Sequence, residues 1–267
     1  MKNYIFSDLA CENVGEKRVK SKQISNRIQK ITFCGDARTD SISCMTFYTP
    51  KLWCLSNEEF FILSRAIAEE LREAVYKAIK PQNAARILVV GLGNPRISSD
   101  SLGARVIDGV YIKRPMSENA SCIMAVAPDV SGNTGIETLD TLKVYVASSK
   151  ADAVVAVDAL RARSYQRLAA TVQLSNGGIK PGSGVGGYSA ELSYETLGVP
   201  IVSIGIPTVI SSATLLYDVL SRFGDLEVDV TELLENNANF LVTPKEIDLL
   251  IRSGGMLLSD AINAALS

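Results

Sequence analysis

Between residues 56 and 80, apolar side chains recur at every fourth position, which is the spacing of one face of an α-helix. They are Leu63, Ile67, Leu71, Val75 and Ile79. Ser56 and Glu59 have the spacing of a capping box at the start of this helix, and Pro81 cannot continue it. We therefore predict a helix over residues 56–80. The first 55 residues have no comparable period, and we expect an irregular subdomain there.

Beyond residue 86, the apolar residues come in short continuous runs, as in strands that are buried on both faces of a sheet. The runs lie at residues 87–90, 122–126, 153–157, 171–174 and 201–204. Segments of helical spacing lie between several of them, at residues 102–112, 136–147 and 209–223. This alternation predicts an α/β fold, with a largely parallel sheet flanked by helices and with N- and C-terminal elaborations.

The last helix should begin after Thr243 and Pro244, because a threonine N-cap followed by a proline at the first helical position is typical of a helix start. It should run to about residue 266, either unbroken or interrupted at Gly254–Gly255. The expected organisation is an irregular subdomain plus a helix over residues 9–83, followed by an α/β domain with this C-terminal helix over residues 84–267.

The composition restricts the chemistry that the chain can perform. Its 267 residues are 47% hydrophobic, which is enough for a substantial core. They include 27 Lys and Arg and 29 Asp and Glu. A net charge of −2 gives no basic excess, so we expect no direct nucleic-acid partner. The chain has no histidine, which excludes Ser-His-Asp and Cys-His catalysis and every metal site that needs imidazole. Catalysis would have to use carboxylates, lysines, hydroxyls, thiols or backbone dipoles.

The cysteines and the termini bear on the compartment. Five cysteines without a C-x-x-C pair argue against a disulfide framework or a Cys-only zinc site and favour reduced thiols. The N-terminus lacks the apolar segment of a signal peptide. No stretch approaches the roughly 18 apolar residues of a membrane span. We therefore expect a cytoplasmic protein with no membrane partner.

Two aspartates stand where ligands bind in an open α/β sheet, beyond the carboxyl ends of its strands. Asp100 follows the glycine turn Gly91–Asn94 and precedes a predicted helix. Asp158 directly follows the apolar run 153–157, where burial would raise its pKa. Each could instead cap the helix that follows it. The turn does not match a dinucleotide site, because Arg96 stands where that fingerprint needs a third glycine.

A glycine-dense segment at residues 176–187 follows another predicted strand. It lacks the Gly-Lys-Ser/Thr ending of a phosphate loop, so we interpret it as a loop whose backbone can approach a substrate closely. Glu137 and Asp140 stand near a predicted helix start, where capping is the favoured interpretation.

Several segments taken together resemble the spore germination protease family. They are Gly91–Asn94 with Asp100–Gly103, Gly132–Asp140, Val157–Leu160, Pro181–Gly186, Glu195–Ile201 and Gly205–Val209. The resemblance covers about residues 84–218 and returns at residues 242–266.

The resemblance implies an endopeptidase of the aspartic class, with a fold like that of the hydrogenase maturation proteases. Such an enzyme degrades small acid-soluble spore proteins during germination and cuts them after an acidic residue. It is made in the forespore as a zymogen, acts in the spore core, forms a homotetramer and needs no cofactor or metal.

The resemblance also implies roles for particular residues. Asp100 and Asp158 match the catalytic acids of the family. The expected substrate-binding residues are Asn94, Glu137, Gly182, Ser183 and Gly184. Asp8 and Leu9 match the processing site, so residues 1–8 would be a propeptide.

Two carboxylates can hydrolyse a peptide without histidine or metal. When they share one proton, the ionised group can activate a water and the protonated group can protonate the peptide. Two alternatives stay open. Residues Pro95–Ser99 depart from the turn of the family, which would fit an inactive member that binds spore proteins without cutting them. A metal-dependent maturation peptidase would need Asp100 and Asp158 as ligands in place of imidazole.

Overall fold

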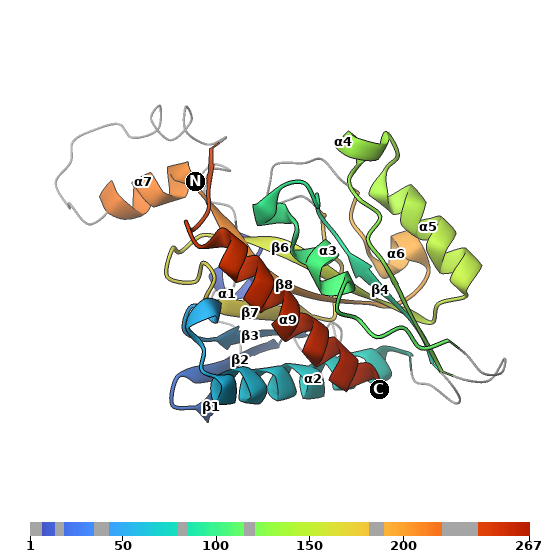
Figure 1. Cartoon of the computed structure of the whole chain (residues 1–267), viewed down its shortest axis with the longest axis horizontal. Coiled ribbons are helices and arrows are strands. Elements are labelled where there is room, and N and C mark those ends of the chain that lie inside the picture. Colours follow the sequence, from blue (N-terminus) through green and yellow to red (C-terminus); the bar gives the residue numbers. More distant parts are fainter. Residues whose placement is uncertain are drawn as a thin grey trace.

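The computed structural model describes residues 7–13, 19–34, 43–79, 85–114, 121–181, 190–220 and 240–267. Within them, one sheet has the order β1-β2-β3-β7-β8-β6-β4-β5, and β9 pairs with β8 (Figure 1). The strands are β1 (Val19–Ser25), β2 (Ile28–Cys34), β3 (Ser43–Tyr48), β4 (Arg86–Gly91), β5 (Cys122–Val126), β6 (Ala153–Ala162), β7 (Thr171–Ser175), β8 (Ile201–Ser211) and β9 (Leu241–Val242). Strands β5, β4, β6 and β8 are parallel, whereas β7, β3, β2 and β1 continue the sheet antiparallel. The predicted α/β class is confirmed, with a mixed sheet.

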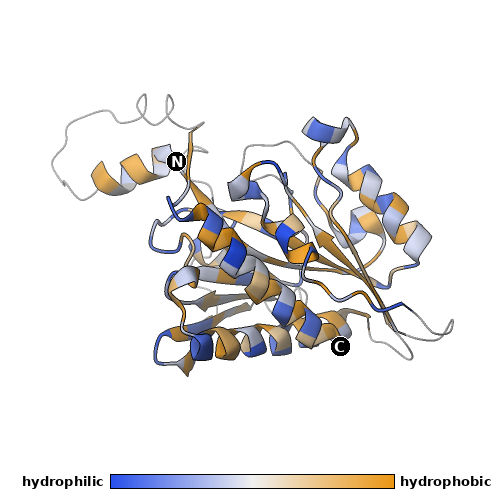
Figure 2. Ribbon diagram, in the orientation of Figure 1, coloured by the Kyte–Doolittle hydropathy of each residue, from blue (hydrophilic) through white to orange (hydrophobic). Residues whose placement is uncertain are grey.

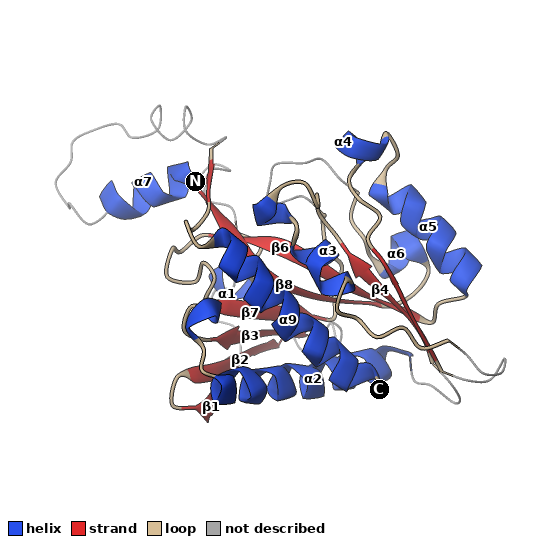
Figure 3. Ribbon diagram, in the orientation of Figure 1, coloured by secondary structure: helices blue, strands red, loops and turns tan. Residues whose placement is uncertain are grey.

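Helices cover both faces of this sheet (Figure 3). They are α1 (Ala10–Asn13), α2 (Asn57–Ile79), α3 (Leu102–Ile107), α4 (Ser131–Thr134), α5 (Thr138–Ser149), α6 (Tyr194–Leu197), α7 (Ser212–Leu220) and α9 (Ile247–Leu266), with 3-10 turns η1 (Leu52–Cys54) and η2 (Ser98–Asp100). Helices α2, α3 and α9 share one hydrophobic core with the sheet, and α5 and α6 share another. α9 lies between α2 and α3 and contacts both (Figure 1).

The parallel strands are buried on both faces, as their continuous apolar runs predict. Val89 and Val155 point into the core with α2, α3 and α9, whereas Leu88 and Val154 point into the core with α5 and α6. Figure 2 shows these strands mostly hydrophobic, between helices with hydrophilic outer faces.

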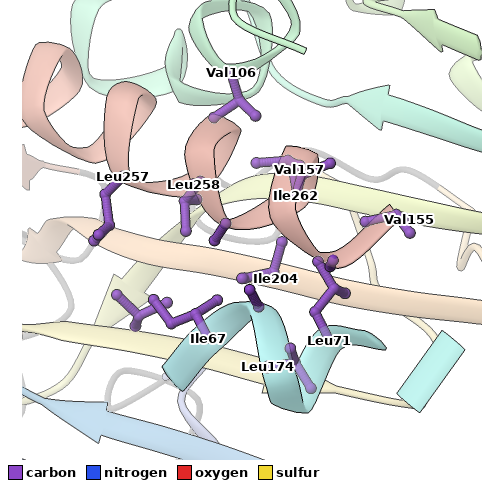
Figure 4. Packing of buried hydrophobic residues seen from close by; sticks show 14 of the residues in the cluster. Ile67, Leu71, Val106, Val155, Val157, Leu174, Ile204, Leu257, Leu258 and Ile262 are labelled. Atoms are coloured by element: carbon purple, nitrogen blue, oxygen red, sulfur yellow. The ribbon is translucent and has the colours of Figure 1, made fainter. Parts of the chain in front are cut away.

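The predicted helix at residues 56–80 is α2, and its capping box is confirmed. The Ser56 N–H donates to Glu59 Oε2 (2.9 Å), and the Glu59 N–H donates to Ser56 Oγ (3.2 Å). The apolar stripe of α2 is buried against α9 and the sheet. Figure 4 shows the shared layer, with Ile67 and Leu71 from α2 and Leu257, Leu258 and Ile262 from α9.

Helix α9 runs without a break through Gly254–Gly255, so the unbroken alternative is correct. It begins after Glu246 rather than after Thr243. A Cβ atom on Gly254 would lie 2.8 Å from Ile206 Cδ1. The glycine is thus kept in the helix because it lets α9 approach β8 closely.

The N-terminal part differs from the irregular subdomain that we expected, because β1, β2 and β3 extend the sheet. β1 has lysines at positions 20 and 22, and its first five residues are exposed. A strand without an apolar face lacks the alternation from which strands are predicted, and a charged edge strand resists further pairing. Two expected helices are also shorter: α3 ends at Ile107, and residues 209–211 belong to β8.

Strand β6 extends beyond the apolar run from which it was predicted. Asp158 therefore lies within the strand, paired with Gly205 of β8, and not at its end. On the other side, β4 ends at Gly91, which pairs with Val157. From Asp158 to Ala162, β6 consequently has β8 on one side and lacks β4 on the other.

Candidate active site

The chain leaves β4 in a tight turn beside β6, and this turn encloses Asp100. The Leu92 N–H still donates to Val157 O (2.8 Å). Gly93 then has a φ of 100°, in the region that favours glycine. A Cβ atom on Gly93 would lie 2.1 Å from Asp100 O and 2.9 Å from Asp100 Oδ1. Only glycine therefore allows the turn to fold this closely over Asp100.

Asp100 is the last residue of η2 and is 4% exposed. Its Oδ2 accepts a hydrogen bond from the Asn94 N–H (2.7 Å). The η2 turn is fastened to β8, since Thr208 Oγ1 donates to Ser99 O (2.6 Å). The Asp100 carboxylate is thus held from both ends of the turn.

Asp158 is 3% exposed, and its Oδ1 accepts a hydrogen bond from the Ala159 N–H (2.8 Å). Neither aspartate caps a helix. Asp158 lies inside β6, and the N-cap position of α3 is occupied by Ser101. The capping alternative is therefore wrong for both residues.

The negative charge of Asp100 acts on Asp158. Burial raises the pKa of Asp158 well above its usual value, and the negative charges of Asp100 and Asp8 raise it further. Burial also raises the pKa of Asp100, while the hydrogen bond from the Asn94 N–H opposes that shift. Two neighbouring acids of this kind bind a proton more readily than isolated aspartates do, and the hydrogen bond to Asp100 favours Asp158 as the protonated member.

Asn94 has a fixed side-chain orientation above Asp100. Its Oδ1 accepts hydrogen bonds from Asn133 Nδ2 (2.9 Å) and from the Arg96 N–H (3.0 Å). Asn133 Nδ2 also donates to Asp129 Oδ1 (2.8 Å). Because two donors hold the oxygen, the Asn94 Nδ2 group points away from them and can donate elsewhere.

Asp8 adds a third carboxylate near Asp158. The Asp8 N–H donates to Arg161 O (3.0 Å), and the Arg161 N–H donates to Asp8 Oδ2 (2.8 Å). Gln173 Nε2 from β7 donates to Asp8 O (2.9 Å). The residue that matches a processing site therefore binds to the same part of β6 as Asp158, three positions farther along the strand.

Glu137 is not among the charges that act on Asp100 or Asp158. Glu137 is exposed at the start of α5, and its side chain makes no capping hydrogen bond. Asp140 forms an exposed ion pair with Lys143 at 3.8 Å. Gly182, Ser183 and Gly184 lie outside the described residues.

Sequence reasoning missed three residues beside the acids: Asn133, Arg161 and Gln173. Asn133 lies inside the matched segment Gly132–Asp140, which is the only sequence signal for it. Arg161 and Gln173 are assembled by the pairing of strands that are distant in sequence, and no local pattern marks them.

In the described ranges, no group of three or more His, Cys, Asp and Glu side chains is arranged to hold a metal ion. A search of the described helices likewise finds none that is long and apolar enough to cross a membrane.

Comparison with known proteins identifies a class and then a family. The family model described as germination protease matches residues 45–232. The germination protease of Clostridium acetobutylicum is 36% identical over 254 residues, which are 83% of this chain and 77% of that protein. The germination protease of Caldanaerobacter subterraneus is 36% identical over 236 residues, or 76% of this chain and 73% of that protein. These matches place the chain among the peptidases. Within that class, the chain belongs to the germination protease family, as its motifs indicate.

Among solved structures, a NiFe hydrogenase maturation protease from Thermococcus kodakarensis is similar at a TM-score of 0.34 and 15% identity, over 70% of this chain and 98% of that chain. A TM-score this low does not support a shared site or activity.

Proposed function

We propose that this protein is an endopeptidase that cleaves small acid-soluble spore proteins after an acidic residue during spore germination. The observation that carries the proposal is the burial of Asp100 and Asp158 where β4 ends beside β6, each with a raised pKa. Membership of the germination protease family supports the reaction class. Aspartates are suited to this reaction because a chain without histidine must move protons with other groups.

Within this proposal, the two acids have different roles. Asp100 accepts the Asn94 N–H, which favours its ionised form, so Asp100 is the base that takes a proton from the attacking water. Burial and two neighbouring negative charges raise the pKa of Asp158, so Asp158 holds the proton. It gives that proton to the peptide as the amine leaves.

Asn94 is the proposed substrate-binding residue of the turn. Its side-chain oxygen is occupied by Asn133 and by the Arg96 N–H, which leaves the Nδ2 group to donate to a substrate carbonyl. Gly182, Ser183 and Gly184 remain predicted substrate contacts, and Glu137 is not supported as one.

The proposal includes synthesis as a zymogen in the forespore, cleavage after Asp8, assembly as a homotetramer and action in the spore core. The position of Asp8 on β6, close enough to raise the pKa of Asp158, supports cleavage by this same site. The tetramer and the forespore location rest on family membership alone.

The test is cleavage of a purified small acid-soluble spore protein, followed by mass spectrometry of the products. Asp100→Asn and Asp158→Asn should each lower kcat/KM by about 10²–10⁴-fold, the contribution of general acid–base catalysis. Asp140→Asn is the matched control, because Asp140 is an exposed aspartate on α5.

Wild-type activity in either amide variant would refute the role of the acid replaced. Binding of the spore protein without products at any pH would favour the inactive alternative. Products that end at residues other than Asp or Glu would refute the proposed specificity and leave the peptidase class intact.

A further inference from the structure

Residues Ser7–Leu9, just before α1, lie against the rim of β6 as a bound peptide would. The Asp8 N–H and the Arg161 C=O form one hydrogen bond of 3.0 Å, as in strand pairing. The return bond runs from the Arg161 N–H to the Asp8 carboxylate (2.8 Å) and not to a backbone oxygen. This position therefore accommodates an extended residue with a short acidic side chain.

Two side chains complete the position. Gln173 Nε2 donates to the backbone carbonyl of Asp8 (2.9 Å), which fixes the peptide beyond the acidic side chain. The Arg161 guanidinium is partly desolvated, which lowers its pKa, and the Asp8 charge acts in the opposite direction. Because the Asp8 carboxylate is hydrogen-bonded to the backbone of Arg161, the positive charge on the same residue favours an anionic ligand over a neutral one of the same shape.

The next residue occupies an apolar position. The Leu9 side chain is fully buried, with Leu160 and Ala162 of β6 and the partly buried Ile179 around it. The bound segment thus presents an acidic residue followed by an apolar residue, and Asp8 is close enough to Asp158 for its charge to raise the pKa of that group.

The segment is also anchored at Glu12, on the C-terminal side of Leu9. Glu12 accepts hydrogen bonds from the Arg163 N–H (2.7 Å) and the Ser164 N–H (2.8 Å), and it forms an ion pair with Arg167 (2.9 Å). Such anchoring keeps Asp8 and Leu9 on the rim of β6 in the intact chain.

We propose that Arg161 and Gln173 form the substrate subsite for the acidic residue, and that Asp8 of the same chain occupies this subsite in the intact protein. The ligand is an extended peptide with an acidic residue followed by an apolar one, which binds when Asp8 no longer fills the position. Arg161 is the specificity-determining residue, and Gln173 holds the peptide backbone. This inference rests on the proposed function, of which it names the recognition site.

The experiment uses the full chain carrying Asp8→Ala, Leu9→Ala and Glu12→Gln, which removes the competing carboxylate, the buried leucine side chain and the charged anchor of the segment. Two fluorescent peptides are compared by anisotropy and by mass spectrometry; they are identical except for Asp-Leu-Ala or Asn-Leu-Ala at their centre. The acidic peptide should bind about 10-fold tighter or more, the effect of one charge-assisted hydrogen bond. With Asp8, Leu9 and Glu12 restored, the segment fills the site again, and both peptides should bind more weakly.

Substitutions in the subsite then show which side chain causes the preference for the acidic peptide. Arg161→Gln in this triple variant should abolish the preference for Asp over Asn, whereas Arg161→Lys should retain most of it. Arg163→Gln is the matched control, because Arg163 is an exposed arginine near the end of β6, and it should leave the ratio unchanged. Gln173→Leu should weaken the binding of both peptides equally.

Equal binding of the two peptides, no binding of either, or a preference that survives Arg161→Gln would each overturn the subsite. Cleavage of both peptides at equal rates would overturn it as well and would leave the proposed peptidase activity standing. An Arg161-dependent binding preference without products would support the subsite and refute the proposed activity.

Discussion

Replacing Gly93 by alanine tests whether the turn after β4 holds Asp100 in its working position. At a φ of 100°, an L-residue is strained by about 1–2 kcal/mol. The new Cβ atom would also meet Asp100 O at 2.1 Å, and this atom cannot move aside as a flexible side chain would. Overpacking of this kind costs about 1–3 kcal/mol. Together, Gly93→Ala should lower the free energy of unfolding by about 2–5 kcal/mol, a large part of the stability of a typical domain.

Gly198→Ala is the matched control, because Gly198 also has a positive φ, of 74°, but a Cβ atom there would have no neighbour within 4 Å. It should cost only the backbone strain, about 1 kcal/mol. Urea denaturation of both variants separates the strain from the clash, and cleavage of a spore protein measures the effect on the site. Gly93→Ala should reduce kcat far more than KM, because Asp100 Oδ1 would lie only 2.9 Å from the new atom. Equal stability and equal activity of the two variants would refute the idea that the turn positions Asp100.

Three further predictions follow from the site. Because burial and neighbouring charges raise the pKa of Asp158, the folded protein binds a proton that the unfolded chain releases, and stability falls as the pH rises above about 4. Asp158→Asn should therefore shift the urea midpoint upward at pH 7 and leave it unchanged near pH 3; a lower midpoint at pH 7 would contradict this. Asn133→Ala removes one of the two donors that hold the Asn94 side chain and should reduce kcat by about 10-fold, the value of one hydrogen bond, while circular dichroism stays unchanged; full activity would count against this positioning role. Glu12→Gln removes the charge that anchors the N-terminal segment and should speed hydrogen exchange of the Leu9 amide by about 10-fold or more; unaltered exchange would show that other contacts suffice.

The parallel half of the sheet and both aspartates could be predicted because their signals are local. A continuous apolar run predicts a strand buried on both faces, and Asp158 directly follows such a run. β1 could not be predicted, because an edge strand with polar residues on both faces has no hydrophobic period. The end of β6 was missed for a related reason, since Asp158 and Arg161 interrupt its apolar run.

Residues around the acids that sequence reasoning missed depend on distant partners. The contact between Asp8 and Arg161 joins positions 153 residues apart, and that between Asn94 and Asn133 joins positions 39 residues apart. Only strand order and register bring such groups together. A single sequence therefore indicates the candidate acids, but it does not indicate the residues that contact them from distant parts of the chain.

Because β4 ends at Gly91, the last residues of β6 have one edge at which the backbone of another polypeptide can form hydrogen bonds. The Asp8 N–H forms such a bond with Arg161 O. Such an edge accepts only chains whose own amide and carbonyl groups are unoccupied. In the helices and sheets of other proteins, the amide and carbonyl groups already form hydrogen bonds with each other. Such segments would have to unfold locally before they could bind. A protein with such an edge therefore excludes folded proteins by their backbone conformation, whatever their side chains are.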